Sequence, residues 1–214
     1  MRTIQNSILL LLFCTFSSIA QENDFQTWTS FSANKKIIKN TRLSVKTGLR
    51  LRENSSLYSK LFTDLKIKSK YNKHFSFAIG YRFSNDWNKQ LELSQKNRFY
   101  SDIYYKDKYK KRFLFDARAR LQTQGNIEEY AATFRHKSAL AYNIPKTKLE
   151  PSVALEYFLP FESILIEKLR YTIGISHPIT KDLDVELAYR IQQEFYTNNP
   201  QTLFIFEGKL AYDF

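Results

Sequence analysis

Residues 75–84 read Phe-Ser-Phe-Ala-Ile-Gly-Tyr-Arg-Phe-Ser, with a large apolar side chain at every odd position and a small or basic one at every even position. Successive side chains of a β-strand point to opposite faces, so this alternation predicts a strand with one apolar and one polar face. The pattern recurs in residues 41–52, 112–123 and 183–192, and no helical period of 3.6 residues competes with it. The chain is therefore predicted to be all-β.

Alternation with less contrast extends over most of the remaining chain. Globular strands average about five or six residues, whereas tilted membrane strands need about 9–11. Most segments here run about 10–13 residues, which favours membrane strands. Eleven strands are predicted, at residues 25–33, 41–52, 58–71, 74–84, 97–106, 112–123, 130–142, 149–158, 165–176, 183–192 and 203–214.

An odd number of strands conflicts with the even number typical of bacterial membrane barrels. Either residues 25–33 do not span the membrane, which gives ten strands, or one strand is merged or missed, which gives twelve. The predicted fold is therefore a transmembrane antiparallel up-and-down β-barrel of about 10–12 strands. Its shorter turns are expected to face the periplasm and its longer, polar loops the outside.

The composition supports this class and excludes several others. The 214 residues are 16% aromatic and 25% charged, which is too apolar and too patterned for a disordered chain. A mean hydropathy of −0.45 argues against a helical membrane protein, but not against a barrel, whose strands hide half of their residues from lipid. The single cysteine excludes a disulfide scaffold and a multi-cysteine zinc site.

The first 20 residues have the three parts of a secretory signal peptide. Arg2 supplies the positive charge, residues 8–16 form an apolar run, and Ser18-Ile19-Ala20 precedes Gln21. The apolar run is too short to span a bilayer. We therefore predict that residues 1–20, with Cys14, are removed, and that residues 21–214 form one domain. Export through the Sec pathway would place this domain in the outer membrane of a Gram-negative-type bacterium.

The C-terminal segment ends in an aromatic residue with apolar side chains at alternate positions before it. Leu210, Tyr212 and Phe214 share one face with Phe204 and Phe206. This arrangement resembles the assembly signal of outer-membrane barrels, and the resemblance implies capture by the barrel-assembly machinery during biogenesis. An exposed amphipathic strand can be captured in this way by β-augmentation. The alternative is an ordinary amphipathic strand that ends at phenylalanine.

The region after the signal peptide also resembles an uncharacterised family of outer-membrane β-barrels, domain of unknown function 2490. The resemblance is carried by Phe25-Gln26-Thr27-Trp28, Gly48-Leu49-Arg50-Leu51-Arg52, Gly80-Tyr81-Arg82 and the terminal Tyr-Asp-Phe. It implies a barrel fold. It brings no established activity and no catalytic residues.

A triplet of a small residue, an apolar residue and arginine recurs, and its arginines fall on the polar faces. It reads Gly48-Leu49-Arg50, Gly80-Tyr81-Arg82 and Ala188-Tyr189-Arg190, with a looser echo at residues 117–120. We hypothesise that Arg50, Arg82, Arg120 and Arg190 form a luminal cationic belt at similar height, with room left by the small residues. Rings of arginine or lysine favour anions, so the belt predicts a narrow pore for small anions. In the alternative, the same arginines pair with Asp116, Glu156 and Glu186 and close a structural barrel.

Other function classes find less support in the residues. A hydrolase needs a nucleophile beside an oriented base. An outer-membrane lipid-modifying enzyme, a lipase or an acyltransferase, could use His136 and Ser138, but His136 shares a face with Phe134 and Leu140. We therefore expect no enzymatic activity. A secreted lipocalin-like carrier would need an apolar pocket, whereas the inner face here is charged.

The expected partners follow from the compartment. The net charge of +12 would suit nucleic acid, but the export signal argues against it and favours outer-membrane lipid. No cofactor or metal is implied. Candidate anchors at the membrane interface, where aromatic rings gather, are Trp28, Trp87, Tyr104, Tyr105 and Tyr142.

Overall fold

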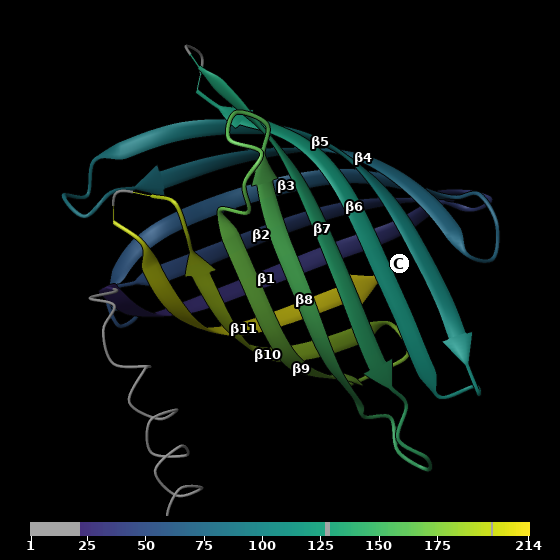
Figure 1. The fold of residues 1–214 in the computed structure, drawn as a ribbon. Helices are drawn as coiled ribbons and strands as arrows, with labels where there is room; N and C mark the ends of the chain where they lie inside the picture. The colour runs from purple at the N-terminus through teal and green to yellow at the C-terminus, as the bar shows by residue number, and fades with distance from the viewer. Residues whose placement is uncertain (1–21, 127–128, 198) are drawn as a thin grey trace, which may run out of the picture.

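A computed structural model describes residues 22–126, 129–197 and 199–214, which form a single closed β-barrel (Figure 1). Residues 1–20, predicted to be a signal peptide, lie outside the described residues. No described segment is a helix long and apolar enough to cross a membrane. The strands are β1 (Glu22–Ile38), β2 (Thr41–Arg52), β3 (Leu57–Lys70), β4 (Phe75–Trp87), β5 (Leu93–Tyr109), β6 (Phe113–Gly125), β7 (Tyr130–Tyr142), β8 (Glu150–Pro160), β9 (Lys168–Pro178), β10 (Leu183–Glu194) and β11 (Gln201–Asp213).

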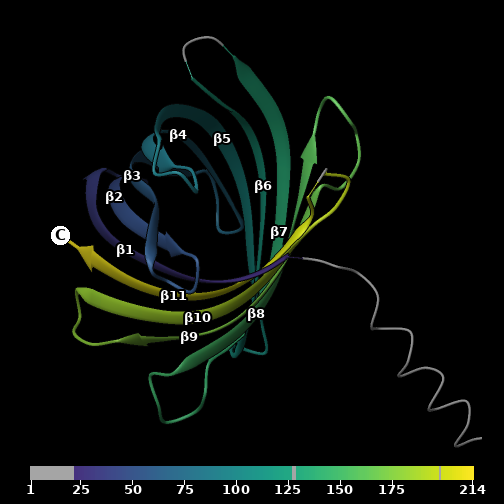
Figure 2. The same cartoon turned by 90° about the vertical axis from the view of Figure 1, so that its left-hand side faces the viewer.

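All eleven segments predicted from the alternation form strands. Consecutive strands pair antiparallel from β1 to β11, and the barrel closes where β1 runs parallel to β11, with Phe25 opposite Phe204 and Asn34 opposite Asp213. Figure 2 shows the two strands side by side and running in the same direction. The barrel therefore has eleven strands, and both alternatives considered from the sequence, ten and twelve strands, are wrong. An odd number of strands closes without a missing partner because the first and last strands pair in parallel, and only this pair departs from the antiparallel pattern.

The strands differ from the predicted segments mainly in length. β1 and β5 each have 17 residues, because both continue at each end beyond the predicted segments, residues 25–33 and 97–106. The connection after β1 is only residues 39–40, and β4 and β5 are joined by residues 88–92, a shorter connection than the gap between the predicted strands 74–84 and 97–106. Register shifts lie between Lys36 and Ile38 and between Arg50 and Leu51. These irregularities blur the alternation at strand ends.

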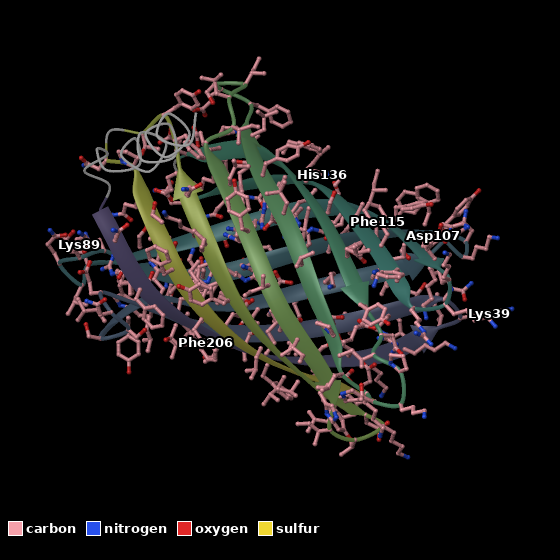
Figure 3. The ribbon with its side chains drawn as sticks, turned by 60° about the horizontal axis from the view of Figure 1, so that its bottom comes forward. Lys39, Lys89, Asp107, Phe115, His136 and Phe206 are labelled. Atoms are coloured by element: carbon pink, nitrogen blue, oxygen red, sulfur yellow. The ribbon has the colours of Figure 1, made fainter. Side chains whose placement is uncertain are left out.

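The connections lie at two rims of the barrel. The turn rim carries residues 39–40, 71–74, 110–112, 143–149 and 179–182, and the loop rim carries the connections that follow β2, β4, β6, β8 and β10. Figure 3 shows Lys39 and Asp107 at the turn rim and Lys89 at the opposite end.

Inward and outward side chains follow the predicted alternation. On β4, Phe77 and Ile79 are exposed on the outside, whereas Ala78 and Ser84 are buried inside. Phe206 likewise lies on the outer surface (Figure 3). Among the described residues, fourteen buried side chains are polar or charged and seven are apolar. The interior of this barrel is therefore polar, and its hydrogen bonds and ion pairs define the candidate site.

Candidate functional site

A cavity of about 500 Å³ lies in the centre of the lumen, and all eleven strands contribute side chains to its lining. Its walls are strongly basic. The lining cations are Lys46, Arg50, Lys66, Arg82, Arg98, Arg118, Arg120, Arg135, Lys168, Arg170 and Arg190, and the lining carboxylates are Asp64, Glu167 and Glu207. Three further carboxylates, Asp102, Glu156 and Glu194, pair with lining cations. This leaves eleven cations against six carboxylates.

The structure brings the four arginines of the hypothesised belt to this one cavity. Three of them pair with carboxylates. Arg82 Nε donates to Asp64 Oδ2 at 2.8 Å, and Arg120 donates from Nε and a terminal nitrogen to the two oxygens of Asp102 at 2.6 and 2.7 Å. Arg190 bonds to Glu207.

Arg50 differs from the other three arginines. Its guanidinium has no hydrogen bond or ion pair to any described residue, and it instead lies over the ring of Trp28, with Cζ 3.7 Å from the ring centroid. Trp28 is only 5% exposed, and its indole N–H donates to Gln26 Oε1 at 2.9 Å. The indole ring is thus held in place beneath a cation whose N–H donors remain available.

The small residues of the recurring triplets have a different role from the predicted one. A Cβ at Gly48 would lie 2.5 Å from the ring of Phe62, and a Cβ at Gly80 would lie 2.2 Å from the ring of Tyr100. Each glycine is the direct cross-strand partner of that aromatic residue. The space is therefore taken by aromatic rings that fold over glycine, as in aromatic rescue of strand glycines, and not by guanidinium groups.

The guanidinium groups of two arginines lie over these aromatic rings. Arg82 lies over Phe62 with Cζ 4.0 Å from the ring centroid, and Arg120 lies over Tyr100 at 3.8 Å. On the other side of the lumen, Phe158 is flanked by two arginines. We call this series the arginine–aromatic belt; its members are Arg120, Tyr100, Arg82, Phe62, Arg50, Trp28, Arg170, Phe158 and Arg135.

One carboxylate gathers three arginines. Glu156 on β8, which is 3% exposed, accepts hydrogen bonds from Arg118 at 2.5 Å, Arg135 at 2.8 Å and Arg170 at 3.0 Å. A single negative charge cannot balance three positive ones, so this cluster keeps an excess of two charges. Arg135 was missed from the sequence because the alternation on its strand is weak.

None of the three carboxylates predicted to pair with Arg50, Arg82, Arg120 or Arg190 meets one of these four arginines. Asp116 pairs with Lys106 at 3.1 Å and Glu186 with Lys209 at 2.7 Å, so neither meets a belt arginine. Glu156 holds three arginines, none of which is among the four predicted. Glu207, the partner of Arg190, lies on the inner face of the C-terminal segment, and the prediction for this segment concerned only its apolar face.

Two of the five candidate interface anchors are luminal. Trp28 belongs to the belt, and Tyr104 donates its hydroxyl to Asp102 at 2.7 Å inside the barrel. The prediction was wrong for these two residues because it rested on residue type, and residue type alone does not show whether a side chain lies on the inner or the outer face of its strand.

The outer face of β7 carries the pair considered for catalysis. His136 Nε2 and Ser138 Oγ are 3.0 Å apart, and this is the only hydrogen bond of His136 to a described side chain. The ring of His136 also contacts Tyr157, its cross-strand partner on β8, at a centroid distance of 5.5 Å. A nucleophile and a base are therefore within hydrogen-bond distance of each other, and no carboxylate among the described residues orients the imidazole.

The predicted assembly motif lies on the outer face of β11. Leu210 and Phe214 are exposed, and the rings of Tyr212 and Phe214 make an edge contact at 4.7 Å. The Phe214 N–H donates to Asn34 O at 2.8 Å, so the motif is joined to β1 in the closed barrel. No group of three or more potential metal ligands occurs within residues 22–126, 129–197 and 199–214.

Comparison with known proteins identifies a family and no activity. No curated protein matches the chain. The model of the family described as "Protein of unknown function (DUF2490)" matches residues 25–203, a stretch that begins in β1, ends in β11 and contains the whole arginine–aromatic belt. Because this match covers most of the sequence, the chain belongs to the family Protein of unknown function (DUF2490).

Proposed function

We propose that the chain is an integral outer-membrane β-barrel whose basic lumen forms a narrow passage that prefers small anions. The observation that carries the proposal is the charge of the central cavity, where eleven lysine and arginine side chains and three carboxylates line the wall. Rings of arginine or lysine attract anions and exclude cations from narrow pores.

The outer surface supports the membrane part of the proposal. Every strand exposes at least one large apolar side chain, a coat that includes Phe31, Val45, Leu65, Ile79, Ile103, Leu121, Leu140, Val153, Ile173, Leu187 and Phe206. Monomeric soluble proteins rarely expose apolar patches above a few hundred Å². Membrane barrels present such a band to lipid.

Unsatisfied donors in the lumen support the anion preference. The Nε atoms of Arg118, Arg135 and Arg190 are buried without an acceptor among the described residues. The Arg50 guanidinium lies over the rings of Trp28 and Phe62 and has no hydrogen bond or ion pair to a described residue. Buried donors without acceptors are costly, so a small anion in the cavity would satisfy groups that the protein leaves open.

The same side chains limit the size of the solute. Glu156 accepts hydrogen bonds from arginines on β6, β7 and β9 and so holds their side chains inside the lumen. Gln122 accepts a further hydrogen bond from Arg135 at 3.1 Å. The passage would therefore suit halide-sized or small oxyanions. A barrel plugged by these contacts is the competing outcome.

Planar-bilayer recording in a potassium chloride gradient tests the proposal. We expect discrete current steps and a reversal potential that reports anion preference. Arg50→Gln should shift the reversal potential toward zero, whereas Lys181→Gln, at the exposed turn rim, should leave it unchanged. The absence of current steps would assign the barrel a structural role, and cation preference would remove the role of the basic lumen.

Localisation and biogenesis need a separate test. We expect the protein in the detergent-extractable outer membrane, with gel mobility that changes on heating. Deletion of Phe214, or Leu210→Ser with Tyr212→Ser, should reduce insertion if the C-terminal motif is captured by the barrel-assembly machinery. Recovery in the soluble periplasmic fraction would favour the carrier alternative.

The hydrogen bond between His136 and Ser138 favours a second candidate, hydrolysis of a lipid ester at the outer face. Ser138 Oγ would attack the ester carbonyl carbon while its proton passes to His136 Nε2, which would then protonate the leaving alkoxide. Water would release the acyl group from Ser138 in a second step.

Fatty-acid release from phosphatidylcholine in mixed micelles tests this second candidate. Activity should disappear in Ser138→Ala and in His136→Ala and persist in His177→Ala, a histidine near the turn rim. If the wild-type barrel releases no fatty acid, the pair is only a contact on the outer face of the barrel.

A further inference from the structure

A second cavity, of about 470 Å³, opens at the turn rim on the side of β1–β5. We call it the turn-rim vestibule; it is lined by Lys36, Asn40, Thr41, Arg42, Lys68, Lys70, Lys73, His74, Ser76 and Lys106. Six of these side chains are lysine or arginine, and no carboxylate of a described residue lines the cavity.

The vestibule continues the lumen. Lys68 and Lys70 follow Lys66 at steps of two residues on β3, so the three side chains share the inner face, and Lys66 lines the central cavity. Lys106 is likewise two residues from Tyr104, which lines the central cavity. Lysine side chains thus extend from the rim toward the arginine–aromatic belt.

Neighbouring carboxylates neutralise only part of this charge. Arg42 meets Asp213 at 3.3 Å, Lys106 meets Asp116 at 3.1 Å, and His74 meets Asp107 at 3.5 Å. Within the part of the chain that the structure describes, the other four cations have no carboxylate partner; these are Lys36, Lys68, Lys70 and Lys73. Lys68 Nζ instead lies 3.8 Å from the centroid of the Tyr104 ring.

The two cavities at the turn rim differ in the charge of their linings. A cavity of about 480 Å³ beside β8–β11 is lined by the carboxylates of Glu150, Asp184 and Glu186 and by only two lysines, Lys148 and Lys209. A general excess of surface lysine would not produce this contrast.

We propose that the turn-rim vestibule binds soluble ligands that carry several phosphate groups. Four uncompensated ammonium groups around one cavity repel each other, and one multivalent anion relieves more of that repulsion than separate monovalent ions. Lysine ammonium, hydroxyl and amide groups are donors suited to phosphate oxygens. The strand residues Lys36, Lys68 and Lys106 of the lining lie on inner faces of the barrel, which favours a soluble ligand over the headgroup of a bilayer lipid.

The inference extends the proposed anion passage to a class of substrate, so its test reads binding and not current. Isothermal titration of the detergent-purified barrel with tripolyphosphate at fixed ionic strength should give one site. Lys68→Gln with Lys70→Gln should weaken binding by roughly tenfold or more, since a charge-assisted hydrogen bond is worth about one decade in affinity. Lys148→Gln with Lys181→Gln, which removes the same charge from the same rim, should change affinity by less than about twofold.

A measurement on the wild-type protein covers the case in which the double variant does not fold. Tripolyphosphate should protect Lys36, Lys68, Lys70 and Lys73 from acetylation, read by mass spectrometry, and leave Lys148 and Lys181 reactive. Absent binding, equal weakening in the two double variants, or uniform protection would overturn the proposal. Displacement of tripolyphosphate by phosphatidylglycerol in mixed micelles would overturn it in favour of a lipid site. Anion-selective current without vestibule binding would leave the proposed function intact, and binding without current would leave the vestibule intact.

Discussion

The guanidinium of Arg50 on β2 lies over the indole of Trp28 on β1, its direct cross-strand partner. This luminal cation has no carboxylate partner among the residues that the structure describes. Arg120, on the same cavity, is bound through two hydrogen bonds to Asp102, whose side chain is fully buried. The fold therefore neutralises the charge of Arg120 and leaves the charge of Arg50 available to an anion.

Their substitution should have unequal effects on stability. Arg120→Gln leaves a buried carboxylate without its partner and should lower the free energy of unfolding by about 3–5 kcal/mol. Arg50→Gln loses a cation–π contact and should cost no more than about 2 kcal/mol. Urea unfolding in lipid vesicles measures both, and Asp102→Asn combined with Arg120→Gln should recover part of the loss. An equal cost for the two single variants would mean that Arg50 has a counter-charge.

Trp28 also reports on anions directly. In a Trp87→Phe background it is the only tryptophan, and iodide should quench its fluorescence more strongly than caesium does, because the surrounding cations concentrate anions. Adding Arg50→Gln should reduce quenching by iodide while quenching by neutral acrylamide stays similar. Equal quenching by iodide and caesium would show that the lumen does not select by charge.

The ring that covers Gly80 makes this position intolerant of a methyl group. A Cβ there would lie 2.2 Å from Tyr100, so Gly80→Ala should lower the free energy of unfolding by about 1–3 kcal/mol. Gly208 is the matched control, since its nearest neighbour would lie 4.0 Å away, and Gly208→Ala should be close to neutral. Tyr100→Ala should make the Gly80 substitution less costly, and full additivity of the two would contradict the contact.

The parallel closure can be tested by cross-linking. Ser32 and Ala211 are partners in the β1–β11 register, so Ser32→Cys with Ala211→Cys, in a Cys14→Ser background, should form a disulfide under mild oxidation. Ser32→Cys with Lys209→Cys is the control, displaced by two residues. Efficient cross-linking of the control alone would place β1 in a different register.

Much of the architecture could be predicted from the sequence because period-two alternation is a local signal. The spacing of Phe75, Phe77 and Ile79 predicts the outer face of β4 without information from any other strand. Closure is not local. The β1–β11 pair joins residues about as far apart as the chain allows. An even number is expected from the rule for bacterial membrane barrels, and no local pattern in the sequence signals this parallel pair.

The site was harder to predict for a related reason. The alternation placed Arg50, Arg82, Arg120 and Arg190 on inner faces, but which carboxylate meets which arginine depends on the stagger between neighbouring strands. Arg82 pairs with Asp64, its cross-strand partner on β3, a relationship visible only once the register is known. The aromatic rings over Gly48 and Gly80 could not be predicted for the same reason. A glycine in the sequence indicates that space is left beside the backbone, but it does not show which side chain fills that space.

Parallel pairing of β1 with β11 has a topological consequence for engineering. β1 starts at the loop rim and β11 ends at the turn rim, so joining the two strand ends would require a linker that travels the whole height of the wall. Thirteen residues of β11 cover about 40 Å along the strand. A short linker therefore cannot produce a circular permutant of this barrel, whereas barrels with an even number of strands have both ends at one rim and can be rejoined there.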